Sequence, residues 1–124
     1  MKEITFKEKF PIFTKRVAKD NYTMSSLEEY FKDKIASHPV AVFIADFDNY
    51  AHTKSLDDGA ISEDILGARN IIFCFGKELM VPEVISVRPR SIGICETKDS
   101  FVISCLEAPA QPANSAMKSW LEAL

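Results

Sequence analysis

The first clear hydrophobic pattern along the chain is helical and covers residues 25–35. Four residues recur there at spacings of three and four positions, which places them on one helix face: Leu27, Tyr30, Phe31 and Ile35. A serine followed three positions later by a glutamate, at Ser25 or equally at Ser26, has the spacing of a capping box. We therefore predict a helix that begins at one of these serines and ends before Pro39.

The carboxyl-terminal segment, residues 112–124, repeats the helical pattern. Its shared apolar face consists of Met117, Trp120, Leu121 and Leu124. Asn114 or Ser115 is the predicted cap, because short polar side chains accept hydrogen bonds from the free N–H groups of a first helical turn. The chain is thus expected to contain two main helices.

Between these helices the apolar pattern changes to that of strands. Residues 40–47 are β-branched and aromatic without polar alternation, which predicts a strand covered on both faces. Residues 70–75 predict a second strand. The connection between them is polar, with one helical turn expected at residues 62–66 that stops at Gly67.

Residues 90–96 and 100–107 alternate in polarity around a short polar turn, which predicts a hairpin. Cys95 and Cys105 lie on its two arms. With the turn centred on Lys98, Cys105 faces a residue about 13 Å along the ladder from Cys95. A disulfide needs Cα atoms within about 7 Å, so both cysteines are expected to be structural.

The segment before residue 20 fits two patterns. Phe6, Phe10, Phe13 and Val17 have helical spacing, but Pro11 interrupts them, and residues 12–18 fit an edge strand equally well. We predict the strand. The order of elements then predicts an α+β fold: a single domain over residues 1–124, with a mainly antiparallel sheet of about four to five strands packed with two main helices.

Three segments between residues 42 and 109 resemble a known family: VFIADFDNYA, ILGARNIIFCFGKELMVPE and VRPRSIGICETKDSFVISCLEAP. Their order is similar to that in the small bacterial proteins of the domain-of-unknown-function 302 family, and the similarity covers about residues 23–110. The resemblance implies a compact sheet flanked by helices and frequent dimers, and it implies no activity. Where that family places Asp-His after a strand, this chain has Asp48-Asn49, with His52 three residues further on.

Composition and charge narrow the class of protein. The chain has 124 residues, 47% of them hydrophobic and 27% charged, which is typical of a soluble globular protein. A formal net charge of −3 without a basic tract disfavours nucleic acid as a partner. Residues 1–10 do not have the pattern of a secretory signal, and no apolar run is long enough to span a membrane. We expect a cytoplasmic protein with no membrane partner and no cofactor.

Acidic residues follow the first predicted strand. Asp46 and Asp48 project to the same side, and Tyr50 and His52 come directly after them. Carboxylates so placed can hold a metal or act as an acid/base pair. The alternative, which we favour, is that these aspartates hydrogen-bond the backbone locally, and we predict no metal site and no catalytic residue.

Two arginines, Arg88 and Arg90, flank Pro89 at the start of a predicted strand. Two guanidinium groups can bind a carboxylate or phosphate with paired hydrogen bonds, which makes these residues the best candidate for a small anionic ligand. The alternative, which we favour, is surface pairing with some of the 18 acidic residues. Cys74 also has two interpretations: a reactive thiol beside Gly76-Lys77, or a buried strand residue, which we favour.

Two hypotheses for function follow. The first is a non-catalytic binding or interaction domain that self-associates as a homodimer, because the predicted strands are apolar on both faces and two helices cover only one of them. The second is a small-anion binding protein or enzyme that uses Arg88 and Arg90 with Asp46, Asp48 and His52.

Overall fold

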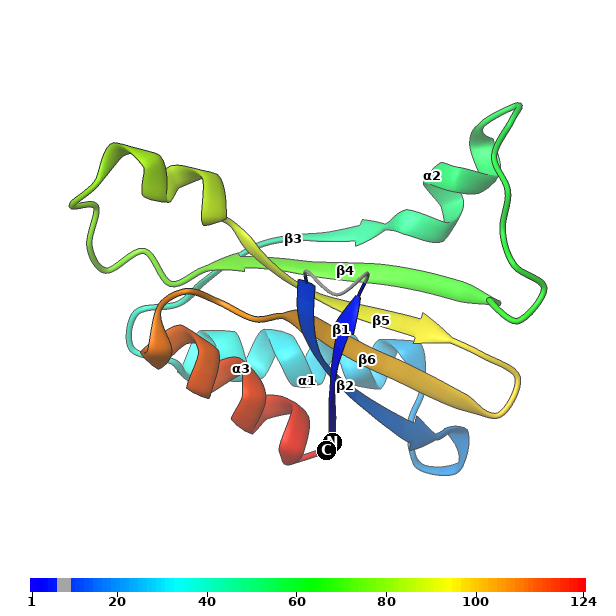
Figure 1. The fold of residues 1–124 in the computed structure, drawn as a ribbon. Coiled ribbons are helices and arrows are strands. Elements are labelled where there is room, and N and C mark those ends of the chain that lie inside the picture. The colour runs from blue at the N-terminus through cyan, green and yellow to red at the C-terminus, as the bar shows by residue number, and fades with distance from the viewer. Residues whose placement is uncertain (7–9) are drawn as a thin grey trace.

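The computed structural model describes residues 1–6 and 10–124 and shows a six-stranded antiparallel sheet with helices against one face (Figure 1). The sheet order is β1-β2-β6-β5-β4-β3. The strands are β1 (Lys2–Phe6), β2 (Phe10–Ala18), β3 (Val42–Asp48), β4 (Gly67–Cys74), β5 (Arg90–Glu96) and β6 (Ser100–Leu106). The helices are α1 (Met24–Ser37), α2 (Asn49–Ser55) and α3 (Gln111–Glu122), with 3-10 turns η1 (Lys19–Asn21) and η2 (Pro82–Val87). The predicted α+β class is confirmed, with more strands than expected and one additional helix, α2.

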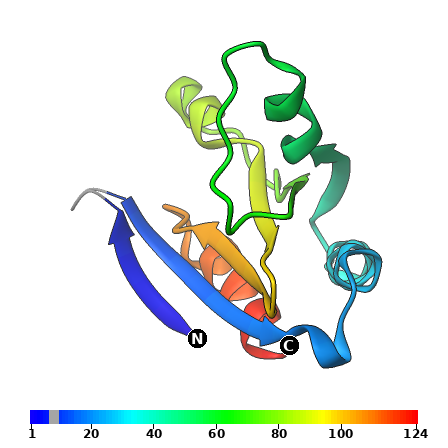
Figure 2. The same ribbon diagram turned by 90° about the vertical axis from the view of Figure 1, so that its right-hand side faces the viewer.

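Helices α1 and α3 lie side by side on the same side of the sheet, and the core is between them and the strands (Figure 2). Helix α1 contacts β3, β4 and β5, whereas α3 contacts β2 and β6. The predicted helix faces are confirmed, because the most deeply buried side chains include Leu27, Phe31, Ile35, Met117 and Leu121. Burying such side chains against a sheet is the main source of stability for helices of this length.

The predicted starts of both long helices are wrong by a few residues. Helix α1 is capped by Thr23, whose Oγ1 accepts a hydrogen bond from the Ser26 N–H (3.0 Å) while the Ser26 hydroxyl accepts one from the Thr23 N–H (2.9 Å). Helix α3 begins at Gln111, so Asn114 and Ser115 are inside it. Buried Asn114 instead accepts a hydrogen bond from the Ala108 N–H (3.0 Å), which ties the chain after β6 to the helix.

Strand order corrects two expectations about the strands. The apolar segment after α1 was expected to be covered on both faces, but β3 is an edge strand whose apolar side chains are largely exposed. The segment before residue 20 is extended, as predicted, but it forms two strands, and β2 lies inside the sheet between β1 and β6. The side chains of Phe6 and Phe10 lie outside the described part of the chain.

The predicted hairpin is confirmed as β5 and β6, with a register one position different from the one expected. Cys105 is opposite Ile92, and Cys95 is opposite Val102. All three cysteines are free. Residues 62–66 form a turn, closed by a hydrogen bond from the Ile65 N–H to the Ser62 carbonyl (3.0 Å), where a helical turn was expected. Among the described residues, no helix is both long and apolar enough to cross a membrane.

Candidate functional site

The candidate site residues fall into two groups at opposite ends of β4. Asp48, at the end of β3, is opposite Arg69 of β4, whereas Arg90 of β5 is opposite Phe73 of β4. Four residues along a strand correspond to about 13 Å, which separates the two groups beyond direct contact. The structure therefore brings Asp46 and Asp48 together with Arg69, and it does not bring them together with Arg88 and Arg90.

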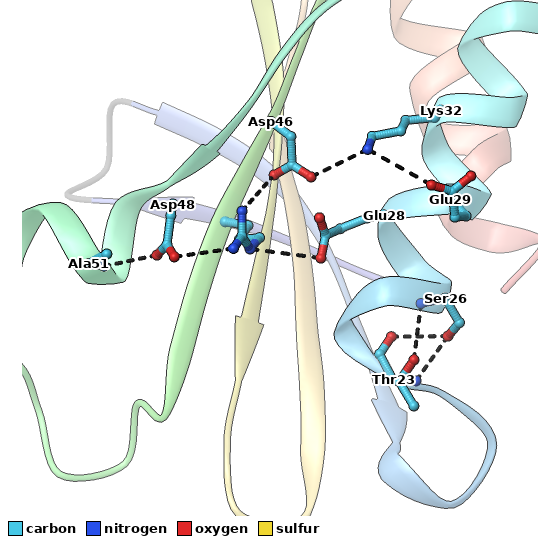
Figure 3. A network of polar contacts seen from close by, with 9 residues as sticks. Thr23, Ser26, Glu28, Glu29, Lys32, Asp46, Asp48 and Ala51 are labelled. Atoms are coloured by element: carbon cyan, nitrogen blue, oxygen red, sulfur yellow. Dashed lines mark hydrogen bonds and ion pairs between the residues drawn. The ribbon is translucent and has the colours of Figure 1, made fainter.

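The first group is an ion-pair network centred on Arg69 (Figure 3). The guanidinium contacts three carboxylates: Nη1 to Asp46 Oδ1 at 3.4 Å, Nη2 to Asp48 Oδ2 at 3.2 Å, and Nε to Glu28 Oε1 at 3.7 Å. Lys32 of α1 also lies 3.6 Å from Asp46. We call these five residues the Arg69 network. Since its members come from α1, β3 and β4, the network connects helix α1 and edge strand β3 to strand β4.

Glu28 has an unusual protonation state within this network. Burial, then a hydrogen bond with Asp46 and repulsion from its charge, raises the pKa of Glu28 to about 7, although Arg69 and Lys32 act in the opposite direction. Near neutral pH the Glu28 carboxyl is therefore protonated much of the time. A carboxyl with such a pKa is chemically suited to proton transfer, but here its partners are other protein side chains.

Asp48 also performs the local backbone role that the sequence suggested. Its Oδ1 accepts a hydrogen bond from the Ala51 N–H (2.8 Å) and caps α2. Helix α2 carries the two remaining candidates of this group. His52 is exposed, and the centroid of its ring is 5.8 Å from that of Phe47. The Lys54 ammonium lies over the ring of Tyr50. In the described part of the chain, no three His, Cys, Asp or Glu side chains are grouped to hold a metal ion.

The second group contains Arg88 and Arg90, whose hydrogen bonds go to backbone carbonyls. Arg88 Nη2 donates to the Glu78 carbonyl (2.7 Å), and Arg90 donates from Nη1 to Val87 (3.3 Å) and from Nη2 to Leu106 (2.5 Å). Neither arginine belongs to an ion pair among the described residues, so the favoured expectation of pairing with acidic side chains is wrong there, and backbone carbonyls take that place. Burial lowers the pKa of Arg90, and its Nε is buried without a hydrogen-bond partner in the described structure.

Beside these arginines lies an apolar cavity of about 480 Å³. It is open to solvent on one side and is lined by the loop of residues 75–88, by the first turn of α3 and by the chain after α1. A smaller recess of about 100 Å³ adjoins it, and Phe75, Val84 and Arg88 line both. The sequence did not indicate this cavity, because its walls come from three segments that are distant along the chain. Its one local signal is the exposed apolar run Leu79–Val81 before Pro82.

The cysteines differ in their surroundings. Cys74 was expected to be buried, but it lies on the face away from α1 and α3, opposite Val42, and is only half-buried. The buried residues of β4 are its neighbours Ile71 and Phe73. Cys105 is the buried cysteine, and desolvation raises its pKa to about 11, so its thiol stays protonated and unreactive.

Comparison with known proteins identifies a family and no function. The family model described as Family of unknown function (DUF6858) matches residues 1–124. This confirms the expectation of an uncharacterised family, although the matching family is not the 302 family that the segment order resembles. The chain has no match among curated proteins or solved structures.

Proposed function

We propose, from the premise that the chain belongs to DUF6858, a family of unknown function, that the protein is a non-catalytic binding module that forms a homodimer. The observation that carries this proposal is the apolar character of edge strand β3. Four of its residues are between 39% and 58% exposed: Val42, Phe43, Ile44 and Phe47. An edge strand presents unpaired backbone groups, and exposed apolar side chains beside them favour pairing with another chain.

The opposite edge of the sheet supports the choice of β3 as the interface. The described side chains of β1 include Lys2 and Glu3, and charged residues at an edge discourage strand pairing. On β3 the only charged residues are Asp46 and Asp48, and both are held by Arg69. The apolar surface of β3 is therefore available to a partner, while its charges are already satisfied within the chain.

The occupant we propose for this edge is β3 of a second copy. Antiparallel pairing of two identical strands is self-complementary, so one two-fold axis buries the same patch on both chains. The remainder of the sheet face away from the helices carries Ser91, Gly93 and Ser104 beside the apolar Ile72 and Val102, so it is only partly apolar. The proposed interface is thus centred on β3 and does not extend over the whole face.

Size-exclusion chromatography with light scattering tests this proposal. We expect the wild type at micromolar concentration to have twice the chain mass of 13.9 kDa. Ile44→Lys should reduce the mass to that of one chain, because it places a charge in the centre of the interface. The matched control is Ile4→Lys on β1, since Ile4 and Ile44 are 49% and 51% exposed on the two edges.

Ile4→Lys should leave the mass unchanged. A wild type with the mass of one chain would refute the dimer, and dissociation by Ile4→Lys but not by Ile44→Lys would move the interface to β1. Circular dichroism of each variant shows that it remains folded, which separates dissociation from unfolding.

A further inference from the structure

The apolar cavity beside Arg88 and Arg90 has the dimensions and lining of a small-molecule site. Its volume of about 480 Å³ falls within the range of about 300–1,000 Å³ that is usual for ligand pockets. Most of its wall is apolar, with Phe75, Met80, Val81 and Val84 on one side and Ala113 of α3 on the other. This wall therefore suits a ligand with an apolar body, because burying apolar surface against it makes binding more favourable.

The cavity and the adjoining recess are lined by three positively charged side chains. Arg88 lines the cavity and the adjoining recess, Arg90 lines the recess, and Lys77 lines the cavity. Glu78 is the single acidic residue in the two linings. The amino end of the 12-residue helix α3 also lines both, through its cap residue Ala110, which supplies no side-chain hydrogen bond. Three cations against one carboxylate favour an anionic group in the ligand.

The hydrogen bonds of the two arginines leave donors available for such a group. A guanidinium has five N–H donors, and Arg88 uses one of them in the described structure. Arg90 directs both terminal nitrogens to carbonyls, but its buried Nε has no acceptor among the described residues. Because this Nε has no accessible surface, Arg90 contributes its charge to the site, and the free donors that a ligand can reach are those of Arg88.

We propose that this cavity binds a small monocarboxylate with an apolar body, whose carboxylate is held by Arg88 and whose body packs on Phe75 and Val84. Arg90, which lines the adjoining recess, adds positive charge beside the carboxylate. A carboxylate has two acceptor oxygens, which suits the paired N–H donors of one guanidinium. This site uses Arg88 and Arg90 without Asp46, Asp48 or His52, which lie at the other end of β4. It goes beyond the proposed dimer, because the β3 interface contributes none of the residues named here.

Trp120 provides a direct reporter of binding. It is the only tryptophan in the chain, it is buried, and its ring stacks on that of Phe75 with centroids 5.8 Å apart. Since Phe75 lines the cavity and the recess, a ligand that contacts Phe75 will alter the surroundings of the indole. Intrinsic fluorescence therefore detects occupancy without a label.

The experiment is a fluorescence titration with decanoate below its micelle concentration, accompanied by thermal unfolding. We expect a saturable change in Trp120 emission and a higher unfolding temperature. Decanol, which lacks the charge, should bind at least tenfold more weakly. Acetate and inorganic phosphate, which lack the apolar body, should produce no saturable change over the same concentrations.

Two charge-removing variants locate the carboxylate. Arg88→Gln should weaken decanoate binding at least tenfold. The matched control is Arg16→Gln on β2, whose guanidinium donates to the Ser100 hydroxyl (2.8 Å) at the opposite end of β6, and it should leave the affinity unchanged.

Several results would overturn the proposal. Absence of a saturable response to decanoate would reject the site. Equal affinity for decanol, or tighter binding of decyl phosphate, would reject the carboxylate as the recognised group. Equal weakening by Arg88→Gln and Arg16→Gln would place binding elsewhere. Because the dimer is tested by mass alone, failure of either proposal leaves the other intact.

Discussion

The two ends of β4 show how arginines can have opposite roles in one small protein. Arg69 faces the carboxylates of Glu28, Asp46 and Asp48, so its charge is neutralised within the chain. Arg88 and Arg90 face carbonyl oxygens, which satisfy N–H donors but carry no full negative charge. Counting charges, and not only hydrogen bonds, therefore distinguishes an arginine that stabilises the fold from one that remains able to bind an anion.

Among the substitutions at the two ends of β4, we expect Arg69→Met to cause the largest change in the free energy of unfolding. The methionine keeps an apolar stem but leaves Glu28, Asp46 and Asp48 facing one another, with Lys32 as the remaining cation of the Arg69 network. We expect the free energy of unfolding to fall by about 2–3 kcal/mol, because removing one partner of a partly buried ion pair leaves uncompensated charge. Urea unfolding followed by Trp120 fluorescence measures the loss. Arg16→Met, which removes one hydrogen bond at an exposed position, is the control, and an equal loss in both variants would contradict a special role for Arg69.

A smaller effect is expected for Glu28→Gln, and it depends on pH. The pKa of Glu28 is about 7 in the folded chain and 4.5 without the fold, so the folded chain binds this proton more tightly. The stability that comes from protonated Glu28 is fully present below about pH 4.5 and is lost as the pH rises through 7. Because glutamine resembles the protonated carboxyl, Glu28→Gln should be more stable than the wild type at about pH 8, by on the order of 1 kcal/mol.

Unfolding curves at about pH 5 and pH 8 test the Glu28 prediction. The difference in stability between the two pH values should become smaller in Glu28→Gln than in the wild type. Glu29→Gln is the matched control, since Glu29 is exposed and lies 3.9 Å from Lys32. A control variant that changes the pH dependence as much as Glu28→Gln would assign the effect to the general charge of α1.

The smallest change in stability is expected at the other end of β4. Arg88→Gln removes one exposed hydrogen bond, to the Glu78 carbonyl, and no ion pair among the described residues. We expect a change in the free energy of unfolding within about 0.5 kcal/mol, as for most surface substitutions. A loss as large as that of Arg69→Met would show that Arg88 is a structural residue and would remove the contrast between the two ends.

Local patterns predicted those parts of the fold that depend on neighbours in sequence. The buried faces of α1 and α3 follow from spacings of three and four residues, and the β5–β6 hairpin follows from two alternating runs. Strand order is not a local property. The apolar composition of β3 indicated a central strand, whereas pairing places it at the edge, where the same composition marks an exposed surface.

The candidate sites show the same limit. Alternation along β3 correctly placed Asp46 and Asp48 on one side, but Arg69 was not singled out, because it lies within a strand and its partners come from two other elements. Arg88 and Arg90 were selected from their position around Pro89. The cavity beside them depends on how α3 and the loop after β4 meet, which no short stretch of sequence specifies.

The pairing of β2 with β6 has a consequence for the order in which the protein is assembled. From β3 to β6 each strand pairs with the next along the chain, and β1 pairs with β2 in the same way. The β2–β6 pairing is different, since it places Ala18 opposite Ser100 and Ile12 opposite Leu106, residues that are far apart in the sequence. Contacts of such long range form late and slowly, because loop closure must precede any gain from them. The β1–β2 hairpin can therefore pair with the rest of the sheet only after β6 has been synthesised. We expect this β2–β6 pairing to limit the folding rate.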